Sequence, residues 1–290
     1  MNSFENILTI VQPRTESFVG IKKAILLAKR NHAELTILLV KPKLSPYLSW
    51  LNQKPVATKS VDSQVKNLRD FSAQVGIKTR LDIVEEQHMS HALAQHVNGN
   101  GVDLVVVEHL HKYTRLWPFD EDEYHQLLNA STNATMFVGR RSWQERGHVL
   151  TAIETEEQTP THRHFNHEIV EKANHFAQLL LSDVHFVSCF SKSCKISFTE
   201  CEEQQPEDKH FQHLTSLIAP YQFSPDHIHI KEGLVDDVLP NQARQLGVNL
   251  VILGCHEHKG LLANIKGHAI DYVLDQLQCD VLAVKPVAIH

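Results

Sequence analysis

The chain has 290 residues, of which 42% are hydrophobic and 21% charged; this is the composition of a globular protein with room for one large domain or two ordinary ones. Its net charge of -6 argues against a nucleic-acid-binding surface, which needs clustered Lys and Arg. No apolar run approaches the roughly 18 residues that span a bilayer, and the first residues lack a signal-peptide pattern. The five cysteines form no CxxC pair, so we expect free thiols and a cytoplasmic protein.

The first half of the chain alternates predicted strands and helices. Short apolar runs predict buried parallel strands, and apolar residues at helical spacing predict helices with one buried face. The predicted strands cover 7–11, 35–40, 78–84, 102–107 and 134–138. The predicted helices cover 18–30, 61–75, 90–97 and 124–130, and residues 43–60 are interpreted as a loop or lid.

From His148 the same order of elements starts again. Strands are predicted at 149–153, 184–187, 227–231, 248–253 and 281–284, and helices at 165–181, 208–219, 235–246 and 270–277. Pro240 is expected only in the first turn of its helix. The two copies are offset by about 145 residues, which indicates a duplicated domain. The fold class is therefore α/β, with two open parallel five-stranded sheets, helices on both faces, and domains at 1–143 and 144–290.

The stretch from Val248 to Gly254 ends a buried strand and opens a loop that also contains Gly260 and Gly267. A helix is predicted to follow from about His268. Strands that end in a glycine loop at a helix start are where α/β proteins hold phosphates, because free N–H groups and the helix dipole favour an anion.

Several features together resemble the universal stress protein family. They are Gly233 at a helix start, the strand at 249–253, the loop from Gly254, and the run C-D-V-L-A-V-K-P at 279–286. The duplication is similar to that of the tandem, E-type bacterial members. The resemblance covers nearly the whole chain and is strongest over 229–286. It implies two adenine nucleotide alpha hydrolase-like domains that pack as an intrachain pseudo-dimer through the edge strands 134–138 and 279–284.

Nucleotide-binding members of that family carry a loop G-x2-G-x9-G-[S/T] after the fourth strand and an acidic residue after the first. The resemblance implies that the loop holds phosphates and that the acidic residue lies beside the nucleoside. In the second copy the first and last glycines and a further loop glycine are present, but Glu257 stands at the second glycine and His268 at the Ser/Thr position. The binding positions carried over are Glu154, Thr155, Gly254, Gly260, Gly267 and His268.

The first copy departs further from the motif. Glu108 stands at the first glycine, residues 109–122 contain no glycine, and Gln12 replaces the acidic residue. Side chains keep the loop backbone from close approach, and Glu108 adds a charge that opposes phosphate. We expect no nucleotide in the first copy.

Three interpretations of the second-copy loop remain open. It binds ATP or a similar nucleotide, with Mg²⁺ as its companion; it is vestigial; or it holds another anionic or apolar ligand in the same crevice. In the vestigial case Gly254 serves a sharp turn and Gly267 serves close helix packing.

The first functional hypothesis is a non-enzymatic cytoplasmic stress-response protein that binds a small ligand or an unidentified protein, with a homodimer as a further expectation. The second is a weak ATPase that uses the 254–268 loop, although no water-activating group is identified. No catalytic residue is assigned.

The third hypothesis is a metal-binding protein, because 21 histidines are present. Several stand in close pairs, but a closed zinc site wants about four ligands, so no metal ligand is assigned and a solvated surface is the alternative. A pH-sensing role is conceivable, although the sequence singles out no residue. The pairs are His88 and His91, His109 and His111, His162 with His164 and His167, His227 and His229, and His256 and His258.

Restoring the family motif in the second copy tests the loop. We expect Glu257→Gly combined with His268→Ser to raise ATP affinity, because the change removes a carboxylate and supplies a hydroxyl that can bind phosphate. Calorimetric titration measures the affinity of both forms. Unchanged affinity would mean that the loop does not have the family's shape.

Overall fold

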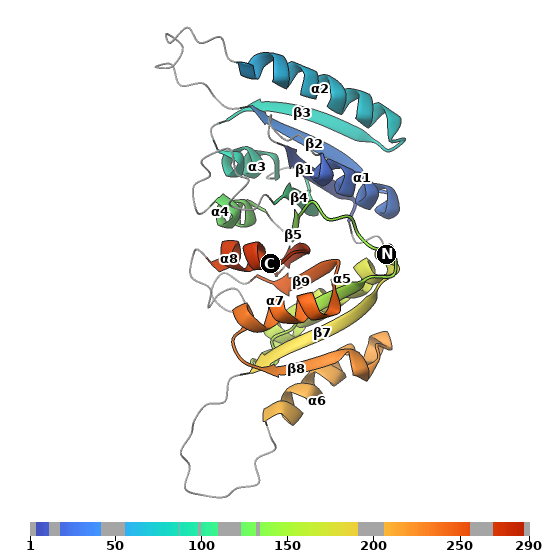
Figure 1. Ribbon diagram of the computed structural model, residues 1–290, viewed down its shortest axis with the longest axis vertical. Helices are drawn as coiled ribbons and strands as arrows, with labels where there is room; N and C mark the ends of the chain where they lie inside the picture. Colours follow the sequence, from blue (N-terminus) through green and yellow to red (C-terminus); the bar gives the residue numbers. More distant parts are fainter. Residues whose placement is uncertain are drawn as a thin grey trace, which may run out of the picture. The chain divides into compact units, whose positions relative to one another are not determined.

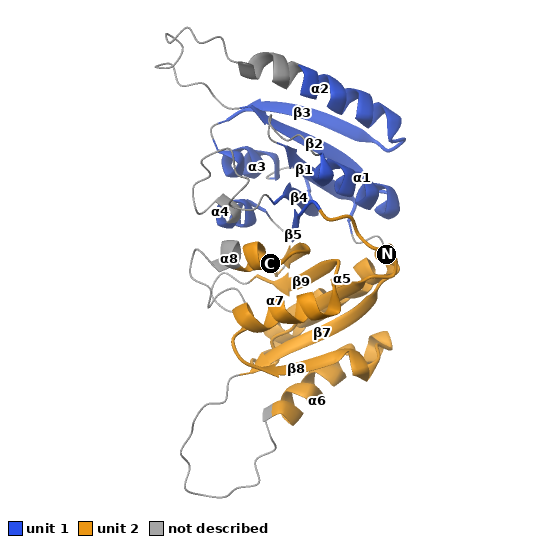
Figure 2. Cartoon of the chain, viewed as in Figure 1, with its two compact units in different colours: residues 1–140 blue, residues 141–290 orange. Residues whose placement is uncertain are grey.

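A computed structural model describes residues 4–11, 18–41, 56–86, 88–97, 100–109, 123–131, 134–190, 206–255 and 269–286. The chain divides into two compact units, Met1–Arg140 and Arg141–His290 (Figure 2). This division falls three residues before the expected boundary at 143/144. Each unit is described separately below.

The first unit is a parallel sheet in the order β3-β2-β1-β4-β5 (Figure 1). Its strands are β1 (Asn6–Val11), β2 (Glu34–Lys41), β3 (Thr79–Glu85), β4 (Leu104–Glu108) and β5 (Ala134–Val138). Its helices are α1 (Val19–Asn31), α2 (Val56–Gln74), α3 (Met89–Val97) and α4 (Glu123–Ala130).

The second unit repeats this order as β8-β7-β6-β9-β10, again with every neighbouring pair parallel (Figure 1). Its strands are β6 (His148–Ala152), β7 (Asp183–Phe190), β8 (Ile228–Glu232), β9 (Leu250–Gly254) and β10 (Asp280–Val284). Its helices are α5 (Pro160–Leu180), α6 (Pro206–Ile218), α7 (Val235–Leu246) and α8 (Ala269–Gln276), with 3-10 turns η3 (Ala219–Tyr221) and η4 (Pro225–His227). The predicted fold class is confirmed in both units.

The helices bury each sheet on two faces. Right-handed crossovers put the helices of the first two connections on one face and those of the last two on the other. Contacts between α3 and α4, between α5 and α6, and between α7 and α8 agree with this arrangement. The inner strands β1, β4, β6 and β9 are accordingly buried along nearly their whole length. None of the described helices is both long and apolar enough to cross a membrane.

The two sheets share one register. Asn6 pairs with Glu34 as His148 pairs with Asp183, and Leu104 lies beside Ile7 as Leu250 lies beside Val149. The separation between matching residues is 142 for the first strand and 149 for the second strand of each unit. Because this separation varies, the two units share their strand pairing and not the lengths of their connecting segments.

Three helices differ from their predicted form. The helix α2 begins at Val56, five residues earlier than predicted, within the stretch interpreted as a loop. The helix α5 also begins five residues early, because Thr159 caps it by accepting the His162 N–H and Pro160 occupies its first turn. Pro240 lies inside α7, beyond its first turn, contrary to expectation. Burial of Leu239, Pro240 and Ala243 offsets the missing hydrogen bond there.

One polar side chain braces the start of the fourth strand in each unit. Asp103 Oδ2 accepts the N–H groups of Glu5 (2.8 Å) and Asn6 (2.9 Å). At the matching position Asn249 accepts the Gln144 N–H (3.0 Å) and donates to the Gln144 carbonyl (2.7 Å). Each brace ties the segment before the first strand to the centre of its sheet.

Asn249→Ala is expected to destabilise the second unit by about 1–3 kcal/mol, because it removes two hydrogen bonds to the Gln144 main chain, each of which contributes about 0.5–1.5 kcal/mol net. Urea denaturation monitored by circular dichroism measures the change. Asn241→Ala is the matched control, since its exposed side chain only accepts from Arg244, and a shift within about 0.5 kcal/mol is expected for it. Equal effects of the two variants would contradict the brace.

Candidate functional site

The candidate site lies at the carboxyl ends of β6 and β9 in the second unit. The chain runs outward from β6 to β7 and β8 and then returns to β9 on the other side of β6. Connections leave this point in opposite directions, which opens a crevice where α/β proteins usually bind ligands. The predicted residues Glu154, Thr155 and Gly254 all lie at this edge of the sheet.

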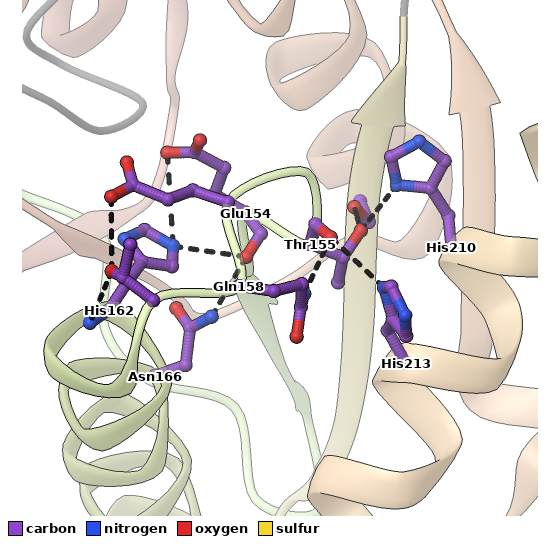
Figure 3. A network of polar contacts seen from close by, with 10 residues as sticks. Glu154, Thr155, Gln158, His162, Asn166, His210 and His213 are labelled. Carbon is purple, nitrogen blue, oxygen red and sulfur yellow. Dashed lines mark hydrogen bonds and ion pairs between the residues drawn. The ribbon is translucent and has the colours of Figure 1, made fainter.

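Glu154 is held in place by its main chain. Its carbonyl accepts hydrogen bonds from Nδ2 of Asn166 (2.8 Å) and Nε2 of His162 (3.2 Å), both on α5 (Figure 3). Because a carbonyl only accepts, Nε2 of His162 must carry the hydrogen. The Glu154 side chain stays 26% exposed, with Oε2 4.0 Å from the same nitrogen. A fixed backbone therefore presents a carboxylate at the crevice.

Thr155 is buried, and its hydroxyl and carbonyl are both engaged in hydrogen bonds (Figure 3). Its hydroxyl lies 2.8 Å from Ser188 Oγ and 2.5 Å from His210 Nδ1. Its carbonyl accepts from Gln158 (2.8 Å) and from Nδ1 of His213 (3.2 Å). This network joins α6 to the segment that follows β6. Thr155 is 3% exposed, so its hydroxyl is out of reach of a ligand.

His210 is the titratable member of this network. Burial lowers its pKa, and the nearby Glu156 carboxylate raises it in part. The ring also stacks on Phe190. A neutral imidazole can accept the Thr155 hydroxyl hydrogen, so the chain Ser188–Thr155–His210 is satisfied without a net charge.

Gly254 is required by close packing and not by a turn. A Cβ at this position would lie 2.7 Å from Cε1 of Phe165 and 2.8 Å from Cδ1 of Ile169 on α5. Its φ is not positive, unlike that of Gly247 and Gly233. The expectation that a sharp turn explains Gly254 is therefore wrong, and helix approach explains it instead.

At the corresponding contact of the first unit, the glycine lies on the helix and the side chain on the strand. Gly20 on α1 and Ile169 on α5 each lie twelve residues before the left-handed C-cap of their helix. A Cβ on Gly20 would meet the Cβ of Glu108 at 3.3 Å. The helix carries the glycine in the first unit and the strand carries it in the second. One glycine is needed at this contact in either case.

Glu108 places a carboxylate at the start of α1. Its Oε2 accepts the N–H of Gly20 at 3.4 Å, one of the first-turn donors that have no partner within the helix. The chain thus puts its own anion where the helix dipole would favour a phosphate. That the first copy binds no nucleotide stays a prediction.

Cys255 directly follows Gly254 and is packed. Its N–H donates to the Val284 carbonyl at 2.7 Å, so this donor is already used in the sheet. Burial raises the pKa of its thiol, which keeps the sulfur protonated and unreactive.

The rest of the predicted loop lies outside the described residues. This applies to Glu257, Gly260, Gly267 and His268, and to the pair His256 and His258.

The histidine pairs do not assemble a metal site in the described part of the chain. No three His, Cys, Asp or Glu side chains there are placed to hold an ion. His227 and His229 instead meet His185 and His148, from two other strands. Sequence reasoning missed His148 and His185, because each is a single histidine without a local pattern. It also missed His210 and His213, although they are three residues apart like His88 and His91, and this spacing could have found them.

A cavity of about 340 Å³ lies at the amino ends of β1, β2 and β3 in the first unit. Its charged lining is paired internally, since Lys78 bonds Glu34 and Arg80 Nε lies 2.9 Å from Asp82 Oδ2. We assign it no ligand.

Gly254→Ala is expected to cost about 1–3 kcal/mol of stability, because the new methyl group overlaps Phe165 and Ile169. In an Ile169→Ala background the same change should cost less, with a coupling of about 0.5–1.5 kcal/mol in a double-mutant cycle. Chemical denaturation of the four proteins gives the cycle. Strict additivity would show that Ile169 does not require the glycine.

Comparison with known proteins gives a family match for the second unit and full-length relatives for the chain. Residues 166–285, within the second unit, match the model of the universal stress protein family. The chain is 23% identical over 302 residues to universal stress protein E of Escherichia coli K12, covering 99% of this chain and 95% of the relative. It is 25% identical over 311 residues to the universal stress protein E homolog of Haemophilus influenzae, covering 98% of each.

Solved structures show the same fold along the whole length. A functionally unknown protein from Pseudomonas aeruginosa PAO1 superposes with a TM-score of 0.72 at 20% identity, covering 99% of this chain and 94% of that chain. A universal stress protein from Archaeoglobus fulgidus superposes with a TM-score of 0.66 at 11% identity, covering 97% and 96%. The family model and the relatives agree: the second unit carries a universal stress protein domain, and the chain over nearly its whole length is similar to universal stress protein E.

Proposed function

We propose that this stress-response protein acts without catalysis, by binding a small ligand in the β6/β9 crevice of its second unit. A nucleotide such as ATP, accompanied by Mg²⁺, is the first candidate ligand. The first unit has a structural role and binds no nucleotide.

The contrast between the two units at one contact carries this proposal. In the first unit the Glu108 carboxylate reaches the N–H of Gly20 and occupies the helix start. In the second unit the matching position is Gly254, which has no side chain. No carboxylate from the end of β9 therefore competes with a ligand anion there.

Glu154 supports the recognition of the uncharged part of a nucleotide. Its carbonyl is clamped by Asn166 and His162, and its carboxylate is partly exposed. A preorganised carboxylate can accept hydrogen bonds from ribose hydroxyls or a base amine with little ordering cost.

Two other groups at this edge do not fit a nucleotide-binding role. The Thr155 hydroxyl and the Cys255 N–H are both engaged within the protein. We therefore assign phosphate recognition to the loop that carries Gly260, Gly267 and His268, from the sequence pattern alone.

Thermal denaturation with Mg²⁺ and ATP tests the proposal. At about 100 times its dissociation constant a ligand stabilises the folded state by about 2.7 kcal/mol, which raises the Tm of a unit of this size by about 5–10 °C. Glu154→Gln should weaken binding by about 10- to 100-fold, because a charge-assisted hydrogen bond contributes about 1.5–3 kcal/mol.

Glu232→Gln is the matched control, since it removes an exposed carboxylate at the carboxyl end of β8, two strands from β6. It should leave the Tm response to ATP unchanged. A Tm that does not move at millimolar ATP would exclude the nucleotide. An equal response in wild type and Glu154→Gln would exclude the role of Glu154.

A further inference from the structure

Four histidines meet at the amino ends of the strands in the second unit, away from the candidate site. His148 starts β6, His185 is the third residue of β7, His227 ends the turn η4, and His229 lies on β8. They come from three neighbouring strands and one connecting turn. The cluster lies outside the machinery proposed above.

His185 is the centre of the cluster and contacts the other three rings. Its Nδ1 lies 3.1 Å from Nε2 of His229, and its Nε2 lies 3.2 Å from Nδ1 of His148. The ring stacks on His227, with centroids 4.2 Å apart. His227 in turn donates from Nδ1 to the Val184 carbonyl at 3.0 Å. Both nitrogens of His185 are thus committed to other imidazoles.

The geometry limits how many protons the three linked rings can hold. A gap of 3.1 or 3.2 Å between two nitrogens has room for one hydrogen. With one hydrogen in each gap and one on each outer nitrogen, His148, His185 and His229 hold at most four. Three neutral imidazoles already carry three. A second added proton must therefore break one of the two contacts.

The surroundings also disfavour charge on the cluster. Burial lowers the pKa of His185 to about 4, helped by His227, His148 and His229 and opposed by Asp183. Burial, Lys231 and His227 lower the pKa of His229. The helix α7 packs on β6 and β7, and α6 packs on β7 and β8. The charged groups of these helices shift neither pKa: Glu207, Asp208, Lys209, Asp236, Asp237 and Arg244.

The cluster joins the outer edge of the sheet to its interior. Among the described strands β8 pairs with β7 alone, and its residues are half-buried or exposed. An element with one partner and little burial opens more easily than the sheet centre. The two contacts of His185 tie β8 on one side and β6 on the other to β7.

The first unit has different residues at the corresponding positions near the amino ends of its strands. By strand register, Asn6 corresponds to His148, Thr36 to His185 and Asp82 to His229. There Asp82 pairs with Arg80 of the same strand, and Nε2 of His96 on α3 lies 3.5 Å from Asp82 Oδ2, so the described residues form no chain of linked imidazoles across these strands. The first unit therefore supplies an internal reference.

We propose that the four-histidine cluster is an acid-sensitive latch, which holds β8 on the sheet at neutral pH and releases it when the rings take up protons. The released element is the outer edge of the second unit, while the first unit keeps its own edge closed.

The sign of the pH dependence follows from the proton balance. The open state, with ordinary histidines of pKa 6.5, binds more protons than the closed state between pH 6.5 and about 4. Stability of the closed edge is therefore complete above pH 6.5 and falls as the pH drops toward 4. Protonation of His185 alone should raise the fraction of molecules with an open β8 edge about 30-fold when the pH falls from 7.5 to 5.

Amide hydrogen exchange tests the latch in the full chain. After correction for intrinsic exchange rates, protection of β8 amides over Ile228–Glu232 should fall about 30-fold from pH 7.5 to pH 5. Protection of β3 amides over Thr79–Glu85 should change by less than about threefold. No fall in β8, or an equal fall in both strands, would overturn the proposal.

Two variants separate the latch from general histidine titration. His185→Phe keeps an aromatic ring that takes no proton and should abolish the pH response of β8. His175→Phe is the matched control, since burial and Lys172 lower the pKa of His175 to about 4 on α5, outside the cluster. The control should keep the full response. A response retained in His185→Phe overturns the proposal.

Two further measurements keep the test decisive. If His185→Phe does not fold, His148→Asn, which introduces the residue of the first unit, removes one of the two contacts and should at least halve the pH response on a logarithmic scale. Repeating the wild-type exchange at pH 7.5 with EDTA checks for a metal. A large loss of β8 protection with EDTA would identify a metal centre and overturn the latch.

Discussion

The contact between the end of the fourth strand and the first helix of each unit has room for one side chain. In the first unit the glycine is Gly20 on the helix, which faces Glu108, and in the second it is Gly254 on the strand, which faces Ile169 and Phe165, so in each unit only one of the two elements carries a side chain there. Each choice keeps the helix close to the sheet, and the sheet core depends on that approach. The position of the glycine also determines which group lies at the helix start. In the first unit the Glu108 carboxylate lies there, whereas in the second unit Gly254 has no side chain.

This exchange gives a structural basis for the proposed difference between the two units. The registers of the two sheets match, so the scaffold has been kept. In the first unit an internal ion occupies the place that a ligand anion would take, at the same edge of the sheet. In the second unit the edge presents Glu154 instead, on a backbone that His162 and Asn166 hold in position. Divergence at a few side chains is sufficient, because the crevice is a property of strand order.

The abundance of histidine also has a structural counterpart in the second unit. At the amino end of β7, His185 links β6 and β8 through two nitrogen–nitrogen contacts. At its carboxyl end, Ser188 meets Thr155, which His210 and His213 join to α6. A single strand is thus fixed at both ends by side chains whose ordinary pKa lies near neutrality. Burial lowers the pKa of His185 and of His210, so these two rings are uncharged under neutral conditions.

The sequence by itself determined the α/β class, the duplication and the order of the elements, because hydrophobic periodicity is local and each parallel crossover needs a helix. It placed the start of α5 too late, because the cap made by Thr159 precedes the periodic residues. It identified Gly254 but not its reason, since Phe165 and Ile169 are about 90 residues away in the chain. Only the tertiary structure turned Thr155 inward and brought His148, His185 and His229 together. Those contacts join residues from different strands, and strand pairing, which no local pattern records, decides which side chains meet.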